Sequence, residues 1–193
     1  MKKIYLLSIA FLACLVAVNA HASTFMAMSQ ADLVRQADAV VQGEVVGLQS
    51  SWAPSGRIIV TDAIIAVDEV LVGSTASSIT VRTFGGKVGD YTVEAHGFPK
   101  FQMGERVILF VQVEPEDGTL RVLGYQQGHF RAVTRLDGVT LAVPMLEEGA
   151  RFFTPGGTLT PEPRSVEIGS FKAGVRATAR QVGRTDVQQG RTR

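Results

Sequence analysis

Few residues in this sequence can do chemistry, and the clearest candidates are two histidines. His96 and His129 are the only histidines after residue 22. A zinc site usually gathers three or four His, Cys or carboxylate ligands. Acids such as Asp90 and Glu94 would therefore have to converge with both rings. Adjacent strands that brought them together would make the chain a metal-dependent hydrolase. If they do not converge, the histidines belong to the surface of a β-barrel.

The other common catalytic arrangements are missing from the sequence. Its one cysteine, Cys14, lies in the N-terminal apolar run, and no serine stands in a G-x-S-x-G frame. There is no G-x-x-x-x-G-K-[ST] frame for phosphate. Paired acids occur, but neighbours in a strand point to opposite faces and the remaining pairs fall in turn-like stretches. These pairs are Asp68-Glu69, Glu116-Asp117 and Glu147-Glu148. The sequence therefore predicts a protein that is not an enzyme and has no cofactor or metal.

A glycine pair at 85–86 precedes the stretch that contains His96. The backbone N–H groups of such a pair can cradle an anion. Without a Lys-Ser/Thr partner or a following helix, the pair is more typical of a turn, because glycine adopts a positive φ without strain. We expect a turn.

Three aromatic residues in predicted loops are candidates for binding a partner. Trp52 lies in "SSWAPSG", and Phe98 and Phe101 lie in the loop before the apolar strand that begins near Glu105. Trp is enriched among the residues that carry binding energy at protein interfaces. Phe98 and Phe101 have a second interpretation, in which they plug the mouth of a barrel.

The N-terminus has the three parts of a secretory signal peptide. Lys2 and Lys3 precede an apolar run over residues 4–18, and Ala20-His21-Ala22 follows as a small-x-small site. The run is shorter than the roughly 20 apolar residues of a membrane span. We therefore expect export, cleavage between Ala22 and Ser23, and membrane contact only during passage, with the mature chain periplasmic or extracellular.

Composition limits the partners of the mature chain. The whole sequence has 19 basic and 18 acidic residues, with an acidic excess before residue 163 and a basic excess after it. A mildly acidic body lacks the basic face that nucleic-acid binding needs. Residues 23–193 contain no cysteine, but a chain of this length can bury about 70% of its unfolded surface without disulfides.

The pattern of apolar residues predicts a chain made mainly of strands. Ser29 and Asp32 have the spacing of a capping box at the start of a short helix that ends near Asp38. Glycines at 43 and 47 mark bends or bulges in the first strand. A second helix is expected from Ser165 to about Arg180. The predicted strands are 40–49, 57–73, 77–84, 105–114, 120–135 with bends at its glycines, and a last hairpin that ends near Pro144.

Strands at regular spacing without helices between them predict an all-β barrel or sandwich, and the long glycine-bent strands favour a small OB-type barrel. The expected organisation is a signal peptide at 1–22, a β-barrel domain at 23–144, a Pro/Gly-rich linker at 145–164 and a helical, then disordered, basic tail at 165–193.

Four blocks carry a family resemblance over about residues 29–135: "ADAVVQGEVV", "VTDAIIAVDEVLVG", "ITVRTFGGKVG" and "PKFQMGERVILFV". In order and spacing they resemble a group of uncharacterised exported bacterial proteins. The order of these blocks along the chain is also similar to that in the barrel domain of tissue inhibitors of metalloproteinases and netrin-type modules. This resemblance implies a five-stranded OB-type barrel. Those inhibitors chelate the protease zinc with the amine and carbonyl of an N-terminal cysteine. Here the expected mature start is Ser23, and no disulfide can hold it.

These observations favour an exported, non-enzymatic module that binds another exported protein, such as a secreted metalloprotease. A metal-dependent hydrolase that uses His96 and His129 is one alternative. An envelope component whose basic tail meets anionic surfaces is another. The sequence leaves the oligomeric state open.

Overall fold

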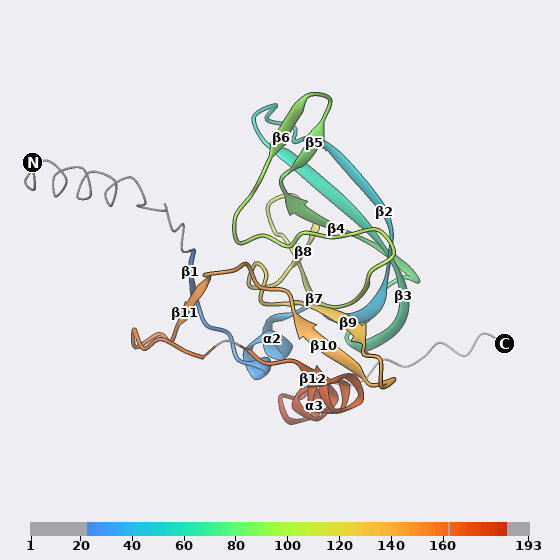
Figure 1. Cartoon of the computed structure of the whole chain (residues 1–193), viewed down its shortest axis with the longest axis vertical. Helices are drawn as coiled ribbons and strands as arrows, with labels where there is room; N and C mark the ends of the chain where they lie inside the picture. Colours follow the sequence, from blue (N-terminus) through green and yellow to red (C-terminus); the bar gives the residue numbers. More distant parts are fainter. Residues whose placement is uncertain (1–22, 162, 185–193) are drawn as a thin grey trace, which may run out of the picture.

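The computed structural model describes residues 23–161 and 163–184, and these residues form mainly strands (Figure 1). Ala22, on one side of the expected cleavage site, lies outside the described residues, and so does the end of the basic tail. None of the helices in the described ranges is long and apolar enough to cross a membrane.

The strands and helices fall into two groups along the chain. The first group is β1 (Thr24–Met26), α2 (Gln30–Gln36), β2 (Ala39–Trp52), β3 (Ile59–Val72), β4 (Ser78–Phe84), β5 (Gly86–Val88) and β6 (Tyr91–Val93). The second group is β7 (Arg106–Val113), β8 (Leu120–Val122), β9 (His129–Thr134), β10 (Thr140–Pro144), β11 (Arg151–Phe153), β12 (Val166–Glu167) and α3 (Ile168–Gln181).

Five strands close into a barrel, as the sequence predicts. β2 pairs with β3, β3 with β4, and β8 joins β4 to β7, which pairs again with β2. All of these pairs are antiparallel except β4 with β8, which is parallel. This order is compatible with an OB-type barrel. The barrel interior holds one apolar cluster, to which Val41, Ile65, Val81 and Leu109 contribute.

A second apolar cluster lies between the outside of the barrel and the two helices. β9, β10 and β12 extend the sheet beyond β7, and α2 and α3 pack below them (Figure 1). Phe171 of α3 contacts Phe110 and Phe130, with ring centroids 6.3 and 4.6 Å away. Val175 is fully buried in the same cluster. Phe171 and Val175 therefore belong to the face by which the C-terminal helix packs on the sheet.

Both helices begin at side-chain caps. Ser29 and Asp32 form the predicted capping box at α2, which is a short helix. For α3 the cap is Glu167 rather than Ser165: its carboxylate accepts the N–H groups of Gly169 and Ser170. The hydrogen bonds from Gly169 and Ser170 lower the pKa of Glu167. The carboxylate also lies at the positive end of the helix dipole, which favours its charged form.

Two segments differ in detail from the sequence-based expectation. The range 120–135 is divided into β8 and β9 by a turn at residues 123–128. Both strands pair antiparallel with β7 and run in the same direction, so the chain leaves the line of the strand at its glycines and then rejoins it. The Pro/Gly-rich range 145–164 includes β11, which pairs in parallel with β1. That pairing joins the start of the described chain to a segment more than a hundred residues later.

Gly43 and Gly47 mark irregularities in β2, as predicted. The pairing with β3 shifts register between Gln42 and Gly43 and again between Val45 and Gly47. A Cβ atom on Gly43 would lie 2.2 Å from the Ala66 carbonyl oxygen and 2.9 Å from Cγ2 of Ile65. Gly43 is thus required by the close approach of β3.

We expect Gly43→Ala to lower the free energy of unfolding by about 1–3 kcal/mol, because the added methyl group would push β3 away from β2. Urea unfolding followed by circular dichroism measures this change. Gly156→Ala is the control, since a Cβ there meets nothing closer than Thr154 Oγ1 at 3.8 Å. An equal loss of unfolding free energy in both variants would contradict the close approach of β3 to Gly43.

Candidate functional site

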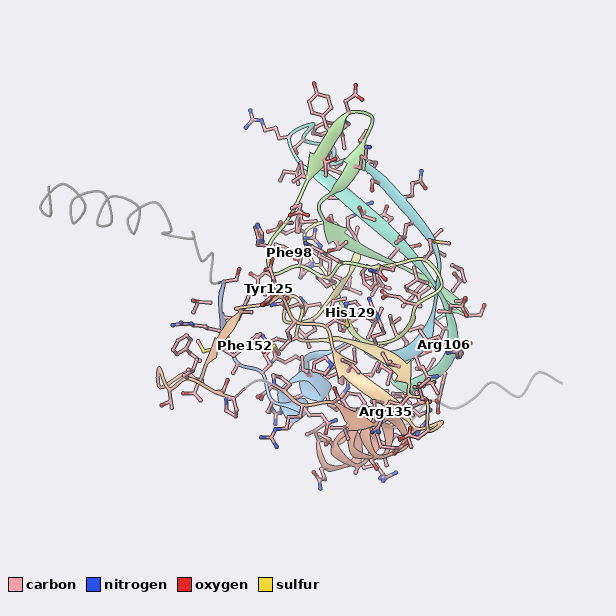
Figure 2. The ribbon with its side chains drawn as sticks, viewed as in Figure 1. Phe98, Arg106, Tyr125, His129, Arg135 and Phe152 are labelled. Atoms are coloured by element: carbon pink, nitrogen blue, oxygen red, sulfur yellow. The ribbon has the colours of Figure 1, made fainter. Side chains whose placement is uncertain are left out.

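A row of five aromatic rings runs along one side of the molecule. Tyr125 stands at its centre, with the Phe98 ring 5.2 Å and the Phe25 ring 5.6 Å away. Phe84 extends the row beyond Phe98, and Phe152 extends it beyond Phe25. Figure 2 shows Phe98, Tyr125 and Phe152 one after another along this side. We call these five residues the aromatic row.

Tyr125 has an unusual backbone for an exposed side chain. Its φ is 61°, and it is the only non-glycine residue with positive φ within 23–161 and 163–184. Such a conformation costs about 1–3 kcal/mol and persists only where the surrounding structure imposes it. Here the turn is fixed by hydrogen bonds from Gln127 N–H to the Gly124 carbonyl and from Gly128 N–H to the Leu123 carbonyl, each 3.1 Å long. The Tyr125 side chain nevertheless remains 52% exposed.

Two cavities meet at Tyr125. The larger, of about 800 Å³, lies between residues 23–28, α2 and the Tyr125 turn, and His96 also lines it. The smaller, of about 300 Å³, is lined by Phe84, Phe98, Arg121 and neighbouring residues. Both volumes fall in the range of ligand-binding pockets. Tyr125 and Gly124 line both cavities, so the two spaces adjoin at this turn.

Glu147 forms hydrogen bonds to the loop that contains His96 and to the turn that contains Tyr125. Its Oε1 lies 2.5 Å from Nδ1 of His96, and its Oε2 accepts the Gly97 N–H at 2.9 Å. The backbone N–H of Glu147 donates to Oε1 of Gln126 at 2.7 Å. The hydrogen bond with His96, opposed by burial and aided by the Gly97 N–H, lowers the pKa of Glu147. Glu147 therefore positions both the loop that carries Phe98 and the turn that carries Tyr125.

The two predicted metal-site histidines lie beside different carboxylates. His96 is exposed next to Glu147, whereas His129 is completely buried under the Phe101 ring. His129 is thus not a barrel-surface residue, because β9 turns its side chain inward beside Leu109. In the described part of the chain, no three His, Cys, Asp or Glu residues are grouped so that they could hold a metal ion.

His129 shares its buried position with an acid. Nε2 of His129 lies 3.7 Å from Oε1 of Glu105, which is beyond hydrogen-bond distance. Oε2 of Glu105 accepts from Nε and Nη2 of Arg131 at 2.9 and 2.6 Å. Burial acts to raise the pKa of Glu105, but the nearby His129, the Gln102 backbone and Arg131 outweigh it and lower the pKa. Neither ring nitrogen of His129 has a hydrogen-bond partner within the described residues.

The predicted acidic and glycine features have structural roles. Gly85 and Gly86 have the expected positive φ, at 89° and 134°, but Gly85 joins β4 directly to β5, and Gly86 is the first residue of β5 rather than part of a turn. A Cβ on Gly86 would lie 2.3 Å from Oγ1 of Thr61. Of the paired acids, Asp68 binds Arg106, and Glu69 binds both Lys172 and Arg176 of α3.

The three predicted partner-binding aromatics lie in three different places and share no ring partner. Trp52 is the last residue of β2 rather than a loop residue, and it packs edge-on against Tyr91 while 41% exposed. Phe98 belongs to the aromatic row. Phe101 packs against the barrel cluster and the His129 ring, in accordance with its interpretation as a plug of the barrel mouth.

Tyr125 is the site residue that the sequence interpretation missed. Its local sequence, Gly124-Tyr-Gln-Gln-Gly128, has a glycine on each side of an aromatic and two amides. Read as a turn instead of a bent strand, this spacing would have indicated an exposed aromatic. Phe25 and Phe152, which continue the aromatic row beyond Tyr125, come from β1 and β11. No local sequence pattern predicts the pairing of these two strands.

Comparison of the chain with protein-family models, curated proteins and solved structures found no match. The closed five-stranded barrel agrees with the fold implied by the resemblance to metalloproteinase inhibitors and netrin-type modules, and the agreement ends there.

The lowered pKa of Glu147 predicts a pH-dependent stability. A carboxyl with a pKa below its ordinary value of 4.5 stabilises the fold above that value. This contribution is lost as the pH falls through the lowered pKa. We expect Glu147→Gln to be less stable than the natural chain at pH 7 and to lose less stability on acidification from about pH 5 to pH 3. Thermal unfolding at stepped pH measures both effects.

The neighbouring Glu148→Gln is the matched control, because Glu148 is exposed. A Glu147→Gln chain whose stability falls on acidification as steeply as that of Glu148→Gln would contradict the assignment.

We expect His129→Leu to leave the stability of the chain at pH 7 unchanged or to raise it. The ring is buried without a hydrogen bond at either nitrogen, and Glu105, 3.7 Å away, keeps its bonds to Arg131, so an apolar side chain of similar volume removes a desolvation penalty. Urea unfolding measures the change, with Leu109→Ala as a reference that should lose about 2–5 kcal/mol. A loss above about 1 kcal/mol, or a stoichiometric metal present in the natural chain and lost in the variant, would show that His129 has a polar partner.

Proposed function

We propose that this chain is an exported, non-enzymatic module that binds another exported protein through the surface around Tyr125. The observation that carries the proposal is the half-exposed Tyr125 ring, held at a positive φ where two cavities meet. Strained residues persist where the surrounding structure imposes them, and they gather at functional sites. Tyrosine is among the residues that dominate protein–protein interfaces.

The charges around the cavities favour a partner with a neutral surface over a ligand that carries phosphate groups. Two arginines line the smaller cavity, but Asp62 binds Arg82 through two hydrogen bonds of 2.7 Å, and Asp117 binds Arg121 at 2.8 Å. Bonds from Thr119, together with Arg121, lower the pKa of Asp117 to about 2. Since both guanidinium groups are neutralised, nucleic acid is a poor partner for this surface.

A secreted metalloprotease is the specific partner that the barrel resemblance brings into the proposal. In that version Ser23, as the mature N-terminus, would offer its amine and carbonyl to the protease zinc. The Ser23 carbonyl accepts the Arg151 N–H at 2.8 Å, which holds the residue in place but uses one of its lone pairs. An assay of co-secreted metalloproteases decides this version, and activity unchanged by a large excess of the chain would remove it.

The two alternative functions obtain less support from the contacts of their residues. A metal-dependent hydrolase would need His96 and His129 to act together, yet they lie beside different carboxylates. An envelope component would use basic groups at the C-terminal end, where Lys172 and Arg176 are paired with Glu69. Residues 185–193 lie outside the described ranges.

The test is affinity capture from the producer's envelope and medium with the tagged, exported chain as bait, read by mass spectrometry. We expect a recurrent partner whose recovery falls at least about tenfold with Tyr125→Ala, because the substitution removes a central aromatic contact. Trp52→Ala is the matched comparison, since Trp52 is also a half-exposed aromatic but packs on Tyr91 instead of the row.

If only Trp52→Ala loses the partner, the binding surface lies instead where β2 ends and β3 begins, around Trp52. If no partner is recovered by any folded bait, the proposal is wrong. The intact mass of the bait also tests whether the mature chain begins at Ser23.

A further inference from the structure

β1 is an edge strand whose open side faces the larger cavity. It pairs in parallel with β11, and the described sheet has no strand on the other side of β1. The Ser23 carbonyl and the Ala27 N–H both bond to β11. Backbone groups alternate in direction along a strand, so those of residues 24 and 26 point away from β11. Residues 23–28 line the cavity continuously, so the open edge runs along its wall.

The Gln127 side chain shows that a peptide-like group fits this edge. Its Nε2 donates to the Met26 carbonyl at 3.0 Å, and its Oε1 accepts the Met28 N–H at 2.8 Å. One amide therefore makes the donor and acceptor bonds that a neighbouring strand would make. Towards the N-terminus the edge continues with the N–H and carbonyl of Thr24 and the N–H of Met26.

The side chains of the cavity wall are close to electrically neutral, and in a mature chain that begins at Ser23 the N-terminal amine adds one positive charge at the end of the edge. Asp32 is the only Asp, Glu, Lys or Arg among the described residues of the lining, and Arg35 binds it at 2.8 Å. His96 lies against Glu147. Rings of Phe25 and Tyr125 add an apolar surface beside the edge. An occupant that matches this charge distribution has uncharged side chains and supplies its polar groups from its backbone.

We propose that an extended, uncharged peptide segment of the partner adds to β1 as a new strand in the larger cavity. This inference rests on the proposed function and specifies its binding mode. Main-chain hydrogen bonds to Thr24 and Met26 give the affinity, as in other cases of strand addition. A ring or branched side chain of the segment contacts Tyr125, on the face of the edge that carries Phe25, because side chains of neighbouring strands lie on a common face.

The probe is a phage library of random dodecapeptides, panned on the full exported chain. The best peptide is then synthesised, and its affinity is measured by titration calorimetry. Thr24→Pro removes the N–H group that points into the cavity and leaves the bonds between β1 and β11, which residues 23, 25 and 27 make. Thr24→Ala is the matched control, because it shortens the side chain and keeps the N–H group.

We expect Thr24→Pro to weaken the peptide about tenfold, as for one lost hydrogen bond that leaves its partner unpaired, and Thr24→Ala to bind as the natural chain does. Methylation of single peptide nitrogens should abolish binding at alternate positions only, since every second N–H group of an added strand faces its neighbour. This scan remains decisive if Thr24→Pro fails to fold.

Three results would overturn the inference: no enriched peptide, equal affinity for the Pro and Ala variants, or a methylation scan without alternation. Failure of the binding mode and failure of the proposed function can be told apart. A captured partner that is lost with Tyr125→Ala but retained by a folded Thr24→Pro bait contradicts only strand addition. No captured partner, with peptides that bind in the alternating pattern, contradicts only the proposed exported partner.

Discussion

The structure depends on one strand that is apolar on both faces. Residues 107–111 of β7 are all fully buried. Val107, Leu109 and Val111 face the barrel interior, whereas Ile108 and Phe110 belong to the cluster beneath the helices. Alternation along a strand sends successive side chains to opposite faces, so a strand between two cores needs apolar residues at every position. β7 pairs with β2, β8 and β9 and thereby joins the closed barrel to its outer layer.

The same strand holds the turn that presents Tyr125. The Phe110 N–H donates to the Gly128 carbonyl at 2.9 Å, and the Leu123 N–H donates to the Phe110 carbonyl at 2.8 Å. Both ends of the turn are therefore attached to one residue of β7. A Cβ on Gly128 would lie 2.7 Å from the Leu123 carbonyl oxygen, so only glycine allows the ends to meet. The exposed ring is anchored on the most buried strand, which fits a preformed binding surface.

Most of the fold could be predicted from the sequence because its signals are local. The β-branched runs of β3 and β4, the glycines of β2 and the capping box at Ser29 each act within a few residues. The candidate site could not be predicted in the same way. Its central pairings connect Phe25 with Tyr125 and His96 with Glu147, each across fifty residues or more, and one chain carries no local mark of such contacts. Phe98 was found because its loop stands out in composition, and Tyr125 was missed because a glycine-flanked turn resembled a bent strand.

The departures from ordinary stability rules concentrate in the segment from Gly124 to His129. It contains the positive φ of Tyr125, and Nε2 of Gln126 and both ring nitrogens of His129 are buried without hydrogen-bond partners in the described chain. Each of these features opposes folding. Sequences usually agree with their fold at every level, and the exceptions are expected at functional or strained sites. Two cavities, an open strand edge and an exposed aromatic ring meet at this segment, so the part of the chain least explained by stability is also the part best arranged for binding.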